Sequence, residues 1–266
     1  MHNVKNSYIQ TAVESGDPRL AKEALKEIDL LLPQTEDPNE RVYLLFSKSS
    51  CYGLLGDFAQ AREQLNLALQ EQPEDADTKL SFDFHLGLLY QHEGEYPKAL
   101  ETFEMLLLHY GQSLTGPEVR FLYEDIQQRR AFLSVTLERF REAVPLLTEI
   151  LSFDLEQEIR SEALAKLGLC YLEMKDWAAA RDYLLHARAA GGVTKNTGKT
   201  FHFYLGIAYF YTHSPQEAKE QFQTCESRAT EYELPLLNIY RWLATTCKLL
   251  GEVAESERYA RLARPQ

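Results

Sequence analysis

One short phrase recurs along the chain at nearly even spacing. It reads Leu-Gly-x-x-Tyr, with an alanine nine residues after the tyrosine and an aromatic residue or leucine four residues further on. Tyr90, Ala99 and Phe103 belong to one copy, and the tyrosines of two others are Tyr171 and Tyr209. A phrase that returns at a regular interval indicates a repeat architecture, in which each unit buries its apolar face only against its neighbours.

Each repeating unit has the pattern of two amphipathic helices. Apolar residues recur at three- and four-residue spacing, which is typical of helices with one buried face. Small residues at two fixed places, such as Gly87 and Ala99, would let paired helices approach closely, and Gly94 between them indicates a turn. No stretch alternates with period two over a useful length, so we expect no sheet. We therefore predict an all-α chain of antiparallel helix pairs.

This pattern resembles the tetratricopeptide repeat, and the resemblance covers nearly the whole chain. Repeat starts fall near residues 2, 42, 80, 124, 161, 199 and 237, which are 37 to 44 residues apart. The usual period is about 34 residues, and longer helices or longer connectors would both explain the difference. The twentieth place of each repeat holds alanine, except in the seventh repeat, which has Ser256. The resemblance implies a right-handed superhelix (α-solenoid) of seven units, with residues 1–266 as a single domain.

In such a superhelix the first helix of each pair lines the concave surface. Places 2, 5, 9 and 12 of that helix form a stripe separate from its core face, which is apolar in the middle of the chain and polar at its ends. A contiguous apolar patch with a polar rim marks a binding site when it is exposed. We therefore predict that this stripe binds an extended peptide or a partner helix, with Phe46, Phe84, Phe132 and Phe203 as anchors.

The full set of predicted partner-binding residues follows this stripe along the chain. It consists of Tyr43, Phe46, Phe84, Leu88, Gln91, Gln128, Phe132, Phe203, Ile207, Phe210 and Arg241. An alternative interpretation stays open at this point. In a tightly wound superhelix the inner helices touch one another, and the same side chains would then simply pack.

The basic residues near this stripe do not form the family's best-known ligand site. That site is a carboxylate clamp for chaperone C-terminal tails, which needs lysine at place 5 and asparagine at place 9 of one repeat. No repeat here has either residue at that place, so we do not expect a chaperone-tail adaptor. Arg129, Lys166, Arg241 and Lys248 could receive an acidic group, although solvated helix faces explain them equally well.

No motif predicts catalysis, a cofactor or a metal site. The segment from Gly192 to Thr200 resembles a phosphate-binding loop, but five residues instead of four separate its glycines, and a helix precedes it. The histidines and cysteines lack zinc-ligand spacing, and no nucleophile elbow is present. His85 and His92 lie two turns apart on one helix and are expected to form a surface pair. Cys51 and Cys170 share place 10 of their repeats, which indicates equivalent packing.

Charge and hydropathy set limits on partners and compartment. The chain has 28 Lys and Arg against 40 Asp and Glu, a net charge of −12, which argues against a general nucleic-acid binder. Residues 1–133 carry 12 basic and 22 acidic side chains, and residues 134–266 carry 16 and 18. The longest apolar run, near Leu205 to Tyr211, is too short to span a membrane. With no signal-like start and four distant cysteines, we predict a cytoplasmic protein.

Three classes of function remain after these exclusions. The favoured one is an interaction scaffold or adaptor with a protein or peptide partner. The alternative is a peptide- or ligand-responsive regulator that acts through protein contacts, although no helix-turn-helix domain is expected ahead of the repeats. An enzyme would need a catalytic constellation that the sequence does not show. We expect a monomer or weak homo-oligomer, because the final helix from Ala254 to Arg264 is rich in Glu and Arg and would serve as a cap.

Overall fold

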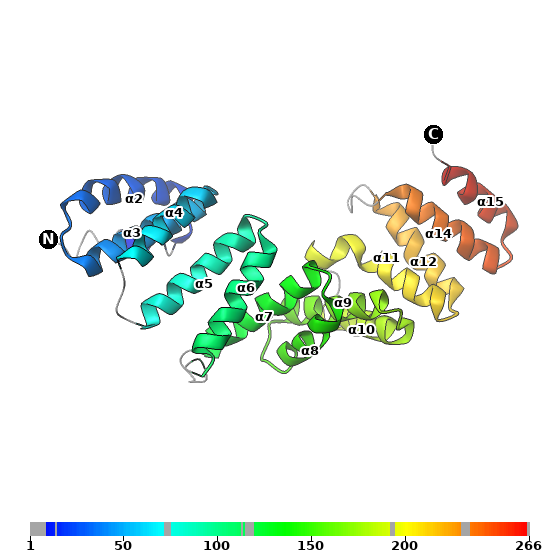
Figure 1. The fold of residues 1–266 in the computed structure, drawn as a ribbon. Coiled ribbons are helices and arrows are strands. Elements are labelled where there is room, and N and C mark those ends of the chain that lie inside the picture. Colours follow the sequence, from blue (N-terminus) through cyan, green and yellow to red (C-terminus); the bar gives the residue numbers. More distant parts are fainter. Residues whose placement is uncertain are drawn as a thin grey trace. The chain divides into compact units, whose positions relative to one another are not determined.

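The computed structural model describes residues 9–13, 15–71, 76–112, 114, 120–191, 195–229 and 235–264. Within these ranges every element of regular secondary structure is a helix, and successive helices pack as pairs (Figure 1). The prediction of an all-α solenoid fold built from antiparallel helix pairs is therefore confirmed. None of the helices in the described ranges combines the length and the apolar character that crossing a bilayer requires.

The chain forms two compact units, residues 1–129 and residues 130–266. Each unit has its own buried side chains: Ile28 and Leu65 belong to clusters of the first, and Phe222 belongs to a cluster of the second. The single domain spanning 1–266 stays a prediction.

In the first unit, paired helices follow the predicted repeats. The described elements are α2 (Pro18–Leu31), the short 3-10 helix η1 (Leu32–Gln34), α3 (Pro38–Leu54), α4 (Phe58–Gln70), α5 (Ala76–His92), α6 (Tyr96–Tyr110) and the first part of α7 (Arg120–Thr136). α3 packs against α4, and α5 packs against α6. α3 and α5 each contain 17 residues and begin four residues before the predicted repeat starts. Because four residues make about one turn, longer first helices account for much of the long period.

The second unit continues the same alternation. Its described elements are the last part of α7, α8 (Phe140–Ile150), α9 (Gln157–Glu173), α10 (Trp177–Ala189), α11 (Lys195–Tyr211), α12 (Pro215–Ser227), α14 (Leu236–Leu249) and α15 (Val253–Leu262). α9 pairs with α10, α11 with α12, and α14 with α15. α9, α11 and α14 are therefore first helices of three successive repeats, and α9 also contacts α11.

The helices of a pair meet where the repeated phrase places its glycine and its alanine. Cα of Gly206 lies so close to Phe222 that a β-carbon at position 206 would stand 2.7 Å from Cε1 of the ring. Gly87 and Gly168 make the same approach to Phe103 and Leu184. The alanines at the twentieth place, from Ala21 to Ala218, are completely buried. Small residues thus set the distance between the two helices, as the sequence predicts.

In the α3–α4, α5–α6, α9–α10 and α11–α12 pairs, a hydrogen bond to the backbone carbonyl of a tyrosine closes the turn. The backbone carbonyl of Tyr52 accepts a bond from the N–H of Asp57 at 3.0 Å, which ends α3. This closure needs a residue in the left-handed conformation, and Gly56 supplies it with φ of 78°. The Asp57 carboxylate then caps α4 by accepting from the N–H of Gln60 at 3.2 Å. Asp176 repeats both roles in the second unit.

The close helix contact makes a stability prediction. We expect Gly206→Ala to lower the free energy of unfolding by about 1–3 kcal/mol, because the added methyl group overlaps the Phe222 ring and overpacks the pair. Gly53→Ala is the matched control, since a β-carbon there would lie 3.8 Å from Cδ2 of Leu89, an ordinary contact. Urea unfolding followed by circular dichroism measures both variants. Equal losses at the two positions would contradict the idea that the glycine contact sets the helix spacing.

Candidate partner-binding surface

A pocket of about 500 Å³ lies between two first helices of the second unit. Its lining residues are Phe203, Phe210 and Tyr211 from α11 and Asn238, Arg241, Trp242 and Thr245 from α14. Four of these seven residues are aromatic, and a fifth, Arg241, is charged. The pocket therefore combines apolar walls with a few polar groups, which is typical of a ligand site.

The aromatic walls of this pocket are held in place by further rings. Trp242 meets Phe210 edge to face, with ring centroids 5.1 Å apart, and stacks on Phe222 of the core at 5.6 Å. Tyr211 stacks on Trp177 at 4.1 Å. Rings fixed by such contacts have little freedom left to lose, so the shape of the pocket is set by packing within the unit.

α14 contributes the polar side of the pocket. Asn238, Arg241 and Thr245 follow one another by three and four residues along one face of the helix, and all three are exposed. The Thr245 hydroxyl donates to the backbone carbonyl of Arg241 at 2.9 Å and is thus engaged within the helix. In the described part of the chain the Arg241 guanidinium has no acidic partner. It therefore presents its N–H donors to whatever enters the pocket.

A second, smaller pocket of about 80 Å³ lies between α9 and α11. Its lining residues are Ala165, Lys166, Leu169, Leu184, Thr200, Phe201 and Tyr204. The ammonium group of Lys166 lies 4.8 Å from the ring centre of Phe132 and 3.4 Å from a carboxylate oxygen of Glu162. The charge of Lys166 is therefore compensated inside the protein, unlike that of Arg241.

The first unit carries predicted binding residues on α3, α5 and α7. Phe46 stacks on Phe82 with ring centroids 4.7 Å apart. The Arg129 guanidinium lies 5.8 Å from the ring centre of Phe84 and donates to the side-chain oxygen of Gln91 at 3.3 Å. Phe46, Phe84, Gln91 and Arg129 are half-buried, and these contacts show that part of their surface serves packing within the unit.

Three stretches of the chain match models of a known protein family. Family models of the tetratricopeptide repeat match residues 42–75, 83–113 and 162–186. The chain contains tetratricopeptide repeats. The matched stretches lie in the α3–α4, α5–α6 and α9–α10 pairs, and the α11–α12 and α14–α15 pairs pack in the same way. No curated protein sequence matches this repeat protein.

Solved structures share its fold at low sequence identity. The C-terminal part of a repeat-containing protein from Cytophaga hutchinsonii is 12% identical with a TM-score of 0.66, over 97% of this chain and 93% of that one. The apo form of the quorum sensor NprR from B. thuringiensis is 14% identical with a TM-score of 0.65, over 98% and 85%. A signal transduction ATPase with a tetratricopeptide repeat sensor from Pyrococcus horikoshii is 14% identical with a TM-score of 0.68, over 96% and 41%. These identities establish the common fold alone.

The structure places the predicted binding residues of this repeat protein in three settings. Phe203, Phe210 and Arg241 line the larger pocket. Ile207, one turn away on α11, is 9% exposed and belongs to the core of the second unit. The others are half-buried: Tyr43, Phe46, Phe84, Leu88, Gln91, Gln128 and Phe132. Their role in binding a partner stays a prediction.

Four lining residues of the pocket are absent from the predicted set. Asn238 and Thr245 occupy places 2 and 9 of the seventh repeat, so they lie on the predicted stripe but are not apolar. Tyr211 and Trp242 occupy places 13 and 6, each one residue beyond the stripe. A helix turns by about 100° per residue, and large rings next to a stripe can still reach its edge. Trp242 is one of only 2 tryptophans, which is the signal that could have drawn attention to it.

The expectation that His85 and His92 form a surface pair is wrong for His85. The His85 ring lies against Phe46 with ring centres 5.2 Å apart, and its buried Nε2 has no hydrogen-bond partner among the described residues. Burial lowers the pKa of His85 to about 4, and the nearby charge of His92 acts in the same direction. His92 itself is exposed and stacks on Phe58.

This histidine predicts a pH dependence of stability. The unfolded chain protonates His85 near its usual pKa of 6.5, whereas the folded chain does so only near 4. Unfolding therefore becomes more favourable as the pH falls from about 6.5 to about 4, by up to about 3 kcal/mol. Urea unfolding across this range should show a smaller loss of stability for His85→Leu than for the wild type. His92→Gln is the control and should keep most of the loss; identical pH profiles for wild type and His85→Leu would contradict the prediction.

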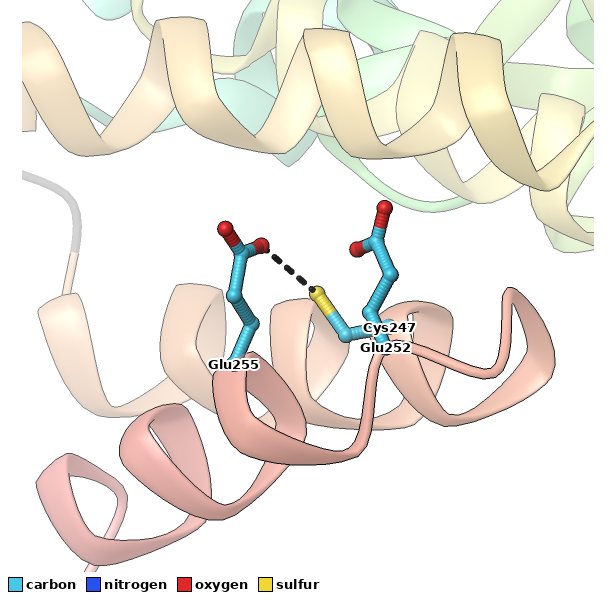
Figure 2. Close-up of side chains that lie close together, drawn as sticks. All are labelled: Cys247, Glu252 and Glu255. Carbon is cyan, nitrogen blue, oxygen red and sulfur yellow. Dashed lines mark hydrogen bonds between the residues drawn. The ribbon is translucent and has the colours of Figure 1, made fainter.

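A cluster at the end of α14 combines one thiol with two carboxylates (Figure 2). Sγ of Cys247 and carboxylate oxygens of Glu252 and Glu255 lie within 4.8 Å of one another, and the thiol points to Glu255 at 3.7 Å. The buried ammonium group of Lys219 from α12 lies 2.6 Å from Glu252 and 2.7 Å from Glu255. Lys219 thus already supplies the positive charge between the two carboxylates. We interpret the cluster as an ion pair that fastens the α14–α15 pair to α12.

The two hydrogen bonds from Lys219 raise its own pKa and lower that of Glu255. We expect Lys219→Met to lower the free energy of unfolding, by more than the loss of an ion pair between two exposed side chains, because the buried ammonium group loses hydrogen bonds to two carboxylates that solvent only partly screens. Lys98→Met is the control, since Lys98 pairs with Glu95 on the exposed surface and such pairs contribute about 0–1 kcal/mol. The difference between wild type and Lys219→Met should shrink as the pH falls through the lowered pKa of Glu255. A constant difference in acid, measured by urea unfolding, would mean that the ion pair is not the cause.

Proposed function

We propose that this tetratricopeptide repeat protein is an interaction scaffold or adaptor that binds a segment of a partner protein on the first helices of its second unit. The tetratricopeptide repeat is a protein-interaction architecture, and the likeness in fold supports that general role. The pocket between α11 and α14 is the observation that carries the more specific proposal. It offers ordered aromatic walls and an arginine without an internal acidic partner in the described part of the chain.

The arrangement of the pockets favours a chain segment as the ligand. The pockets lie between α9 and α11 and between α11 and α14, so three neighbouring first helices each contribute a surface. Packed helices stand about 8–10 Å apart, so three of them span roughly 20 Å. An extended peptide covers that distance with about six residues. We therefore propose an extended peptide or a partner helix rather than a compact small molecule.

A second proposal assigns the same surface to regulation. The fold is shared with the quorum sensor NprR and with a signal transduction ATPase that carries a repeat sensor. In this proposal a peptide or ligand would bind the pocket and alter contacts with another protein. A ligand that copurifies with the protein and is displaced when a partner binds would favour regulation over a simple adaptor role.

The proposed scaffold or adaptor function involves no catalysis and no cofactor. The buried cysteines support this part of it, because burial raises the pKa of Cys51 and Cys170 to about 11 and that of Cys225 to about 12. Thiols with such pKa values stay protonated and are poor nucleophiles. We further propose a cytoplasmic protein that is a monomer or weak homo-oligomer.

The proposed function can be tested by filling the pocket. We expect Thr245→Trp to abolish capture of the partner from cells of the source organism, because the indole occupies the space between α11 and α14. Thr148→Trp is the matched control: Thr148 is also exposed and makes the same hydroxyl-to-carbonyl bond, but on α8. Circular dichroism checks that both variants keep the helical content of the wild type. Undiminished capture by folded Thr245→Trp would move the binding site away from this pocket.

A further inference from the structure

The charges around the larger pocket differ from those of the chain as a whole. Acidic residues make up 40 of the 266 residues, and the net charge is −12. Yet α11 and α14, with 17 and 14 residues, contain no Asp or Glu at all. The two helices that line the pocket thus carry no acidic side chain, although the chain as a whole has an excess of them.

One face of α14 carries basic and polar side chains. Asn238, Arg241, Thr245 and Lys248 follow one another at intervals of three, four and three residues, which places them along one helix face. All four are exposed. Across the described residues neither Arg241 nor Lys248 has an acidic partner.

Two other cations that lie between repeats are compensated. Lys48 of α3 pairs with Asp29 of α2 at 2.8 Å, and Lys219 of α12 pairs with Glu252 at 2.6 Å. An uncompensated arginine beside aromatic walls is therefore distinct from the structural ion pairs of the same chain. A guanidinium group can bind a carboxylate by donating two parallel hydrogen bonds to it.

Resting on the proposed function, we propose that the bound segment is acidic: it places a large apolar side chain between α11 and α14 and an Asp or Glu side chain on Arg241. Phe203, Phe210 and Trp242 receive the apolar side chain, and Asn238 lies where its amide reaches the same segment. Lys248, two turns beyond Arg241 on the same face, extends the attraction along α14. Residues 1–133, with 22 acidic against 12 basic side chains, repel an acidic segment, so the α14 face of the second unit is the more favourable place for it.

A displayed library of random peptides, fused at their C-termini so that only side-chain carboxylates are available, tests the inference. Peptides selected on the wild type should be rich in Asp and Glu next to Phe, Trp or Leu. Selection on Arg241→Glu should replace these acids by Lys or Arg, whereas Arg141→Glu, an exposed charge reversal on α8, should select the same peptides as the wild type.

The outcomes separate the inference from the proposed function. Peptides that bind the wild type, fail to bind Thr245→Trp and show no excess of acids would overturn the acidic segment and leave the pocket as the binding site. Peptides that bind Thr245→Trp equally well, or no selected peptides, would overturn both.

A selected peptide then measures the contact itself. Fluorescence anisotropy should give a Kd about tenfold higher for Arg241→Gln, as expected for loss of a charge-assisted hydrogen bond. Changing the acidic residue of the peptide to its amide should cause a similar loss on the wild type but little further loss on Arg241→Gln. Additive losses in the double change would overturn the pairing of Arg241 with that residue.

Discussion

The close contact between the two helices of a repeat is the constraint on which the rest of this structure depends. Gly206 approaches Phe222 so closely that no β-carbon fits between them, and the buried alanines at the twentieth place act from the other helix. Because the second helix occupies the glycine face of the first, the side chains that flank the glycine lie at the edge of that contact. In α11 these are Phe203 and Phe210, three residues before and four residues after Gly206, and both line the pocket. The binding surface is therefore a consequence of how the pairs close.

Local pattern was sufficient to predict this part of the fold. The glycine, the tyrosine whose carbonyl closes the turn and the aspartate that caps the next helix lie within a few residues of one another, so their spacing is visible in the sequence. The burial of His85 was not visible in the same way. Its ring packs against Phe46 of another helix, and the two-turn spacing to His92 describes only the position on α5. Contacts between repeats are not encoded by the period of one helix.

The residues of the candidate site also fall into two groups: those that helical periodicity predicts and those that contacts between helices bring to the pocket. Place numbers put Phe203, Phe210 and Arg241 on one stripe, and the structure brings these side chains to one pocket. Trp242 and Tyr211 fall one place off the stripe, and they reach the pocket because Phe222 and Trp177 stack against them from behind. Helical periodicity therefore predicts which face is available, whereas the size and support of each ring decide which side chains form the walls.

α14 links the stability of the second unit to the proposed binding surface. One face of this helix carries Asn238, Arg241 and Thr245, while Ile239, Leu243 and Cys247 are buried in the core. The turn that follows α14 holds Glu252, whose carboxylate is bound by Lys219 of α12. Local opening of a helix costs less when its buried contacts weaken. A change at Lys219 would therefore loosen α14 and weaken binding at Arg241 without touching the pocket, and the two effects can be separated because only loss of the ion pair lowers the stability of the unbound protein.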